Sequence, residues 1–176
     1  MTKNSKSFHL TIDLISIIVL IILDRITKNL AVSHLKDKPA YPIINKVFVL
    51  SYLENRGAAF GIFQNKQIFF LIVSVIFVVA ITYILLKLPL EKKFLAAEIV
   101  LVFLAAGAFG NMIDRAFQNY VVDFFYFELI DFPVFNVADI YVTLSCIALF
   151  ILIVFVYKED DLEFLNFKKK NKDEQI

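Results

Sequence analysis

The sequence predicts an all-α integral membrane protein with four transmembrane helices. The chain has 176 residues, 60% of them hydrophobic, and its mean hydropathy is +0.74. Soluble domains are about half apolar, so an excess of this size in so short a chain is hard to bury in one water-soluble core. The apolar residues also fall into four runs, each close to the roughly 20 residues that a helix needs to cross a bilayer core.

The four runs are residues 10–30, 68–87, 94–113 and 139–157. The first run is interrupted by Asp13 and Asp24, whereas the second has no charge across its centre. The third carries Glu98 near its start, where the side chain can reach the interface, and the fourth again has an uncharged centre. A cleavable signal peptide is the alternative for the first run. The charged DRITK motif just before the poor cleavage site at residues 31–33 argues against it.

Two long loops, residues 31–67 and 114–138, separate these runs and are expected on one side of the membrane. The termini and the short link at residues 88–93 lie on the other side and carry more Lys and Arg than the loops do. Because basic segments stay in the cytoplasm, we expect cytoplasmic termini and extracytoplasmic loops. Residues 1–157 are predicted to form one membrane-embedded domain. Residues 158–176 are predicted to be a charged cytoplasmic tail. Its part at residues 162–176 is predicted to be solvated and disordered rather than resting on anionic lipid.

Composition excludes several classes of function. The formal net charge of +1 argues against a nucleic-acid binder, which would show a basic face. The single cysteine, Cys146, excludes an intramolecular disulfide, a CxxC redox pair and a thiolate zinc site. Two histidines leave little scope for imidazole ligands. We therefore expect neither a metal nor another cofactor.

Polar residues that could do chemistry gather on the side of the long loops. They are Asp24, Lys28, Asn55, Asn111, Asp114, Arg115, Asp123, Asn136 and Asp139. The convergence of these residue types on one membrane surface predicts a site there. In the third run, the small residues around Gly107 and Gly110 predict close packing against another helix.

Most of these residues also have a structural explanation. Asp24 and Lys28 are four residues apart and could neutralise each other on one helix face. Arg115 could pair with the neighbouring Asp114 or interact with the carboxyl end of its helix. Asn136 or Asp139 could cap the fourth helix. Asp123 is flanked by Val and Phe, so we interpret it as a carboxylate held in an apolar wall rather than the polar face of a strand.

Asp123 and Asp139 suggest one specific chemistry if they approach each other. Two close, desolvated carboxylates cannot both be ionised, so they share a proton and titrate as a unit. The ionised member can then take a proton from water while the protonated member donates to a scissile carbonyl oxygen. Such a pair hydrolyses an amide without a metal, serine or cysteine.

These residues lie in five motifs whose order resembles that of the lipoprotein signal peptidases, the type II signal peptidases of bacteria. The motifs are DRITK (24–28), ENRGAAFG (54–61), GNMIDR (110–115), VVDF (121–124) and FNVAD (135–139). Each is weak alone, but together, in order and between four apolar runs, they are specific.

The resemblance implies an inner-membrane aspartyl endopeptidase that removes the signal peptide from diacylglyceryl-modified prolipoproteins, just before the lipidated cysteine. It implies Asp123 and Asp139 as the catalytic pair. It further implies that Asn55, Gly57, Asn111, Arg115 and Asn136 support the site or hold the substrate, and that Asp24, Lys28 and Asp114 are structural polar residues. An extracytoplasmic β-cradle built from the long loops is also implied, and the β-rich residues 47–53 fit it.

The substrate implied by the resemblance is a lipid-bearing signal helix that must arrive laterally from the bilayer. The expected partners are therefore this prolipoprotein and membrane lipid, with no nucleic acid, and the protein is expected to be a monomer. Acyl chains could supply much of the binding free energy. We expect aromatic walls such as residues 124–127 to accept them.

Three other functions fit parts of the pattern. A small channel with an acidic mouth explains carboxylates at the membrane edge but not the Asn and Gly motifs. A magnesium-dependent lipid-headgroup enzyme could use the Asp and Asn oxygens, yet the sequence lacks several Asp at helical spacing. The third is a structural scaffold with no catalysis. Sensitivity to a chelator and cleavage of a lipidated substrate separate these functions from a peptidase.

Overall fold

The computed structural model describes residues 3–57 and 66–165 of the chain, with side chains from residue 6 onwards. This part contains the helices α1 (Lys3–Leu35), α2 (Gln67–Lys87), α3 (Leu95–Gln118) and α4 (Val137–Ile151). The π-helical turn η4 (Leu152–Val156) continues α4. Each predicted apolar run is thus helical. The first helix is longer than its run at both ends, and α3 extends past residue 113 to include Asp114 and Arg115.

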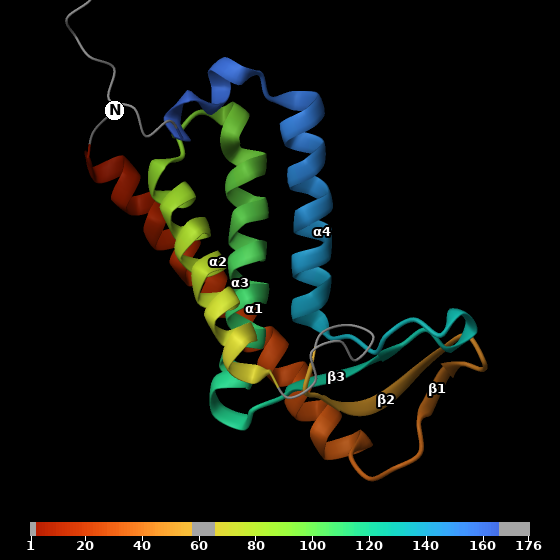
Figure 1. Cartoon of the computed structure of the whole chain (residues 1–176). Coiled ribbons are helices and arrows are strands. Elements are labelled where there is room, and N and C mark those ends of the chain that lie inside the picture. Colours follow the sequence, from red (N-terminus) through yellow and green to blue (C-terminus); the bar gives the residue numbers. More distant parts are fainter. Residues whose placement is uncertain (1–2, 58–65, 166–176) are drawn as a thin grey trace, which may run out of the picture.

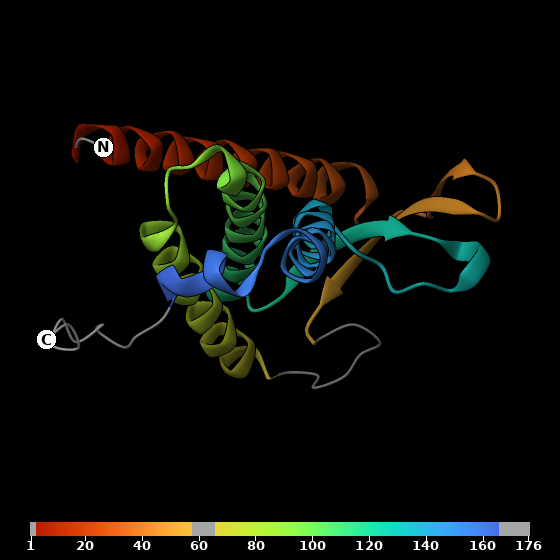
Figure 2. The same cartoon turned by 90° about the horizontal axis from the view of Figure 1, so that it is seen from above.

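Helix α3 lies at the centre of the helices and contacts α1, α2 and α4 (Figures 1 and 2). Ten residues of α3 are buried, among them Ala105, Ala106, Gly107 and Gly110. A Cβ atom added to Gly107 would lie 2.6 Å from the carbonyl oxygen of Ala138 on α4. The small residues therefore allow α3 and α4 to approach each other closely, as the sequence predicts.

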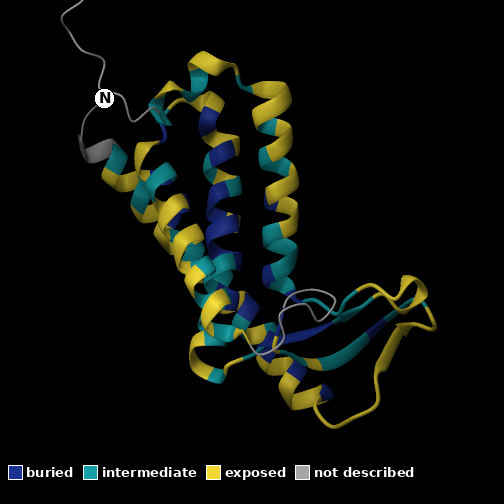
Figure 3. Cartoon of the chain, in the orientation of Figure 1, coloured by how far each residue is buried: buried dark blue, intermediate teal, exposed yellow. Residues whose placement is uncertain are grey.

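Three helical stretches in the described part of the chain are long and apolar enough to cross a membrane. They are Gln67–Lys87, Lys92–Gln118 and Val137–Val156. Helix α1 is not among them, and its apolar run carries Asp13, Asp24, Arg25 and Lys28. The outward faces of the helices are largely exposed (Figure 3). Many of the exposed residues have large aliphatic or aromatic side chains.

A three-stranded antiparallel sheet lies at one end of the helices (Figure 1). Strands β1 (Tyr41–Ile44) and β2 (Phe48–Asn55) come from the first long loop, and β3 (Val121–Tyr126) comes from the second. The strand order is β1-β2-β3, and β2 pairs with β3 so that Leu53 lies opposite Asp123. The expected small β-structure made from both loops is therefore present. The first turn of α1 and the end of α4 lie at the opposite end of the molecule (Figure 1).

The predicted disorder of the tail is wrong for the segment that the structure describes there. After Tyr157, residues Glu159–Leu165 form the 3-10 helix η5. Lys93 pairs with Asp161 at 2.7 Å, and the ring of Phe164 meets Phe94 edge-to-face at 5.6 Å. Apolar burial by this aromatic contact outweighs solvation of the charged neighbours. The lysine cluster at residues 168–172 and Gly61 of the second motif lie outside the described residues.

Candidate active site

Asp123 lies in the middle of β3, and its side chain is buried with only 1% of the residue exposed. The neighbouring strand β2 ends at Asn55, whose Nδ2 donates a hydrogen bond of 2.8 Å to Oδ2 of Asp123. The backbone N–H of Gly57 in turn donates to Oδ1 of Asn55 at 3.0 Å. This second bond fixes which end of the Asn55 amide faces the carboxylate. Asp123 is thus both a strand residue and a carboxylate within an apolar wall.

Asp139 lies in the first turn of α4 and belongs to its capping box. Oδ1 of Asn136, the N-cap residue, accepts a hydrogen bond from the backbone N–H of Asp139 at 3.0 Å, and the backbone N–H of Asn136 donates to Oδ2 of Asp139 at 3.1 Å. Reciprocal bonds of this kind satisfy N–H groups that a helix start leaves free. Both residues that the sequence offered as caps therefore take part, and the Asp139 side chain is turned toward the start of its own helix.

Asn136 and Asn111 connect the two carboxylates. Nδ2 of Asn136 donates to Oδ1 of Asp123 at 2.6 Å, while Nδ2 of Asn111 donates to Oδ1 of Asp139 at 2.7 Å. Nδ2 of Asn136 also lies 3.2 Å from Oδ1 of Asn111. With the bonds from Asn55 and the Asn136 backbone, each of the four carboxylate oxygens accepts a hydrogen bond from an asparagine.

The electrostatics of Asp123 reflect this arrangement. The pKa of Asp123 is raised to about 7: burial raises it most and the nearby Asp139 carboxylate adds to the rise, while the hydrogen bonds from Asn55 and Asn136 oppose it. Removal from water destabilises the charged form of a carboxyl, and so does a second negative charge. Both effects favour the protonated form of Asp123.

Behind the pair lies a buried ion network. Nζ of Lys28 is 2.8 Å from Oδ2 of Asp24 and 2.9 Å from Oδ2 of Asp114, and these three residues are at most 1% exposed. Arg25 contacts the other oxygen of Asp114 at 2.6 Å. The predicted pairing of Asp24 with Lys28 is confirmed, whereas Asp114 pairs with Lys28 and Arg25. Arg115 lies instead over the ring of Phe70, at 5.1 Å from its centroid.

Asp24 also ties α1 to the start of α4. Its Oδ1 accepts a hydrogen bond of 3.0 Å from the backbone N–H of Ala138. Gly110 makes this approach possible, because a Cβ there would lie 2.7 Å from Oδ2 of Asp24. Asp24 of α1 therefore helps to position the helix turn that carries Asp139. The contact requires glycine at residue 110 of α3, because any side chain there would occupy the space of the Asp24 carboxylate.

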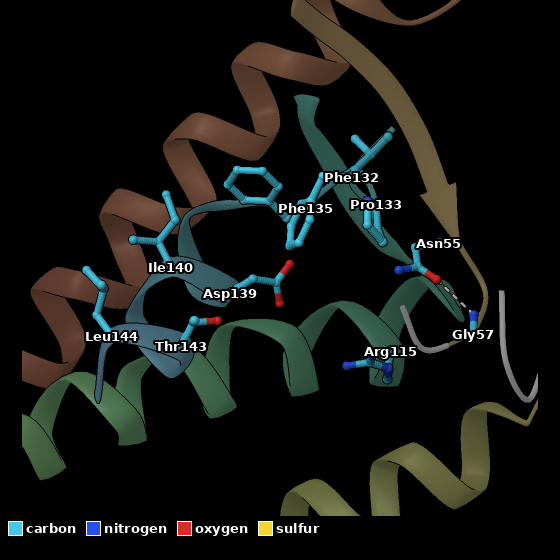
Figure 4. A pocket seen from close by; sticks show the side chains of 11 residues that line it. Asn55, Gly57, Arg115, Phe132, Pro133, Phe135, Asp139, Ile140, Thr143 and Leu144 are labelled. Carbon is cyan, nitrogen blue, oxygen red and sulfur yellow. Dashed lines mark hydrogen bonds between the residues drawn. The ribbon is translucent and has the colours of Figure 1, made fainter. Parts of the chain in front are cut away.

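A pocket of about 460 Å³ opens beside Asp139. Its walls are the segment Phe132, Pro133, Val134 and Phe135, the α4 residues Asp139, Ile140, Thr143 and Leu144, and Asn55, Gly57 and Arg115. Figure 4 shows the Asp139 side chain projecting from α4 into this space, with Arg115 and Asn55 across from it. Mostly apolar walls with a few polar groups are typical of a ligand site.

The described residues that line this pocket include Asp139 but not Asp123, which is buried. Residues 124–127, expected to accept acyl chains, do not line it either. Phe124 is buried in a core cluster and Phe125 stacks on Phe48 at 5.9 Å. These rings therefore pack in and beside the sheet. The apolar wall of the pocket is formed instead by the segment from Phe132 to Phe135.

Within the described ranges, the structure contains no group of three or more His, Cys, Asp or Glu side chains placed to hold a metal ion. The Asp123 and Asp139 oxygens accept hydrogen bonds from N–H donors of asparagines.

Comparison with known proteins decides the family. The family model described as Signal peptidase (SPase) II matches residues 16–155. The chain belongs to the signal peptidase II family. This assignment makes it a protease and a membrane enzyme, in agreement with its apolar helices.

Relatives and solved structures agree with this assignment. The chain is 41% identical over 154 residues to the lipoprotein signal peptidase of Clostridium tetani, a match that covers 86% of this chain and 96% of the relative. It is 43% identical over 138 residues to that of Brevibacillus brevis, covering 78% and 91% of the two chains. A solved structure described as a bacterial membrane enzyme superposes with a TM-score of 0.72 at 28% identity, covering 90% of this chain and 94% of that one.

The structure of this signal peptidase II family member brings together all the polar residues that the sequence singled out. Sequence reasoning missed Thr143, the Phe132–Phe135 wall and Arg25. Thr143 follows Asp139 by four residues on the same predicted helix, so helical spacing could have found it. Arg25 lies inside the first motif as a charge that needs a partner, but nothing in the sequence pairs it with Asp114.

Proposed function

We propose that this protein is an aspartic endopeptidase that cleaves the signal peptide from diacylglyceryl-modified prolipoproteins immediately before the lipidated cysteine. The observation that carries the proposal is the arrangement of Asp123 and Asp139, whose four oxygens accept hydrogen bonds from Asn55, Asn111 and Asn136. The names of the curated relatives, lipoprotein signal peptidase, support prolipoproteins as the substrate class.

The proposed reaction uses one proton shared by the two carboxyl groups. The ionised carboxylate takes a proton from water as the water oxygen bonds to the scissile carbonyl carbon, and the protonated carboxyl gives its proton to the carbonyl oxygen. The pair then protonates the amide nitrogen and takes back a hydroxyl proton as the C–N bond breaks. An acid and an amine leave, and the pair again holds one proton. The raised pKa of buried Asp123 supports a pair that holds one shared proton near neutral pH.

We propose that α1 is a fourth transmembrane helix. Its charged residues Asp24 and Lys28 are buried against α3 and α4, while its outward face exposes aliphatic residues such as Ile15, Ile18 and Ile22. Charges inside a membrane are tolerated when they pair within the protein. With four spans, both termini lie in the cytoplasm, as the basic tails and link favour. The Asp123–Asp139 pair then lies at the extracytoplasmic surface of the bacterial inner membrane.

The pocket suits a substrate that carries lipid. Its apolar wall from Phe132 to Phe135 can contact acyl chains, and the half-buried guanidinium of Arg115 faces the space beside Asp139. Because Arg115 lines the pocket, its guanidinium is proposed to contact polar groups of the substrate or its lipid. The carboxylates are oriented by Asn55, Gly57, Asn111 and Asn136. In this proposal residues 1–157 form the peptidase domain, which acts as a monomer and needs no cofactor.

The test compares two forms of one substrate. Purified protein in lipid is incubated with a prolipoprotein carrying diacylglyceryl-cysteine and with the same prolipoprotein lacking the lipid. We expect cleavage of the lipidated form, with the new amino terminus at the modified cysteine as read by mass spectrometry. Equal cleavage of both forms would contradict lipid-dependent recognition, and cleavage of neither would remove the proposed substrate.

A further inference from the structure

The ammonium group of Lys28 is enclosed by the protein at the back of the carboxylate pair. The residue is 0% exposed, and its Nζ lies within 3.0 Å of three oxygens, on Asp24, Asp114 and Asn111. A lysine is seldom buried this completely unless acceptors surround it. The three acceptors come from α1 and α3, so the charge is part of the contact between these helices.

One of the three acceptors touches the proposed catalytic machinery. Oδ1 of Asn111 accepts from Nζ of Lys28 at 3.0 Å, and Nδ2 of the same side chain donates to Oδ1 of Asp139 at 2.7 Å. An amide can turn over and exchange its oxygen and nitrogen. The cation favours one orientation, together with Nδ2 of Asn136, which donates to the same Oδ1 at 3.2 Å. That orientation directs the N–H donor of Asn111 toward Asp139.

The charges around Lys28 nearly balance. Asp24 and Asp114 are the two carboxylates in contact with it, and Arg25 from α1 pairs with Asp114. Arg115 on α3 is a further cation that interacts electrostatically with the carboxylate pair. Loss of the Lys28 charge would leave Asp24 without its partner and add a net negative charge beside β3 and α4.

The proposed catalytic pair lies within reach of this charge. Burial raises the pKa of Asp123, Asp139 adds to the rise, and the positive charge of Lys28 opposes it. A nearby positive charge stabilises an ionised carboxylate. The buried ammonium therefore favours the form of the pair that carries one negative charge over the doubly protonated form.

We propose that Lys28 is a positioning residue for the reaction, which orients Asn111 toward Asp139 and whose buried charge keeps one carboxylate of the pair ionised. This inference rests on the proposed aspartic mechanism. It assigns to Lys28 a role in the pH dependence of the reaction, beyond the pairing with Asp24 that the sequence suggests.

The test is a matched pair of variants that differ only at residue 28. The first variant is Asp24→Asn, which keeps an oxygen that can accept a hydrogen bond from the backbone N–H of Ala138. The second variant combines Asp24→Asn with Lys28→Met. Because residue 24 is uncharged in both, removal of the Lys28 charge does not leave an unpaired buried carboxylate there. The measurement is the pH profile of kcat/KM on the lipidated prolipoprotein, whose acid limb reports the first ionisation of the free enzyme. We expect Lys28→Met to move this limb up by about one pH unit, because an opposite charge close to a carboxylate is removed. We also expect kcat to fall about tenfold as Asn111 loses its anchor.

Controls separate this role from a structural one. Lys87→Met removes an exposed lysine at the far end of α2 and should leave the profile unchanged. Acid limbs that coincide in the matched pair would overturn the inference, even if both variants lose stability or kcat, because a purely structural lysine does not move the limb. If the wild-type protein cleaves the lipidated substrate but the two matched variants have the same acid limb, only this inference is overturned. If the wild-type protein cleaves no lipidated substrate, the proposed function is overturned and this inference with it.

Discussion

The side chain of Asn136 donates a 2.6 Å hydrogen bond to Asp123 across 13 positions of sequence, from the start of a helix to the middle of a strand. The same residue caps α4 and donates its backbone N–H to Asp139. One asparagine therefore sets the position of a helix and of both carboxylates. Because the donors are in place before any substrate arrives, the pair is held in one geometry at little further entropic cost.

Replacing either Asp123 or Asp139 by Asn should abolish processing. An amide can neither accept the proton of water nor supply one to a carbonyl oxygen, and general acid–base groups contribute about 100-fold to 10,000-fold to rate. Release of the signal peptide by purified variants measures the effect. Asp131→Asn, which changes an exposed aspartate bonded to Tyr126, is the control and should process normally. Cleavage by either pair variant at the wild-type rate would remove the carboxylate pair from the mechanism.

Activity should decline above about pH 7. Burial and the neighbouring Asp139 raise the pKa of Asp123 to about 7, so the pair is expected to lose its shared proton above about that pH. The doubly ionised pair has no proton to give to the substrate. The measurement is kcat/KM on the lipidated prolipoprotein from pH 5 to pH 9. A rate that stays constant from pH 7 to pH 9 would contradict the assignment.

Much of this architecture can be predicted from the sequence, because helices that lie in a membrane require long apolar runs. The helices α2, α3 and α4 follow from such runs, and the pairing of Asp24 with Lys28 follows from their spacing of four residues. The two long loops carry the motifs that meet in the sheet and at the start of α4. Those inferences depend on local patterns, which a single sequence contains.

What the sequence does not show are contacts between distant segments. Asp114 is adjacent to Arg115 in sequence yet pairs with Lys28 and Arg25, because the helix turns successive side chains in different directions. The ordered η5 segment depends on Phe164 meeting Phe94, and no local pattern predicts that partner. The pocket wall from Phe132 to Phe135 is one of many aromatic segments, so composition alone could not select it.

Chelation of divalent metals should leave processing unchanged. The oxygens of the Asp123–Asp139 pair accept N–H donors from asparagines, and the proposed mechanism derives its acid and its base from the pair itself. The measurement is the cleavage rate of purified protein in EDTA and after return of magnesium. A clear loss in EDTA that magnesium restores would favour the alternative of a metal-dependent enzyme.

Gly110→Ala should destabilise the protein and slow processing. The added Cβ would lie 2.7 Å from Oδ2 of Asp24, so Asp24 must move away from Lys28 and from the backbone N–H of Ala138. Disruption of such a buried network costs about 2 kcal/mol or more, which lowers the unfolding temperature by about 5 °C. Thermal unfolding of the purified variant in detergent measures this. Ala96→Ser on the exposed face of α3 is the matched control, and equal unfolding temperatures for the two variants would contradict the close approach.

Substitutions of Asn136 separate its two roles. Serine is a good N-cap residue, so Asn136→Ser should retain the start of α4 and unfold near the wild-type temperature. Serine has no amide nitrogen to donate to Asp123 or to approach Asn111, so processing should still fall about a hundredfold as the carboxylates lose their alignment. Asn136→Ala loses the cap as well, at about 1 kcal/mol, and should be both less stable and inactive. If Asn136→Ser were as active as the wild type, helix capping alone would explain Asn136, and the amide bridge between the two carboxylates would have no part in the reaction.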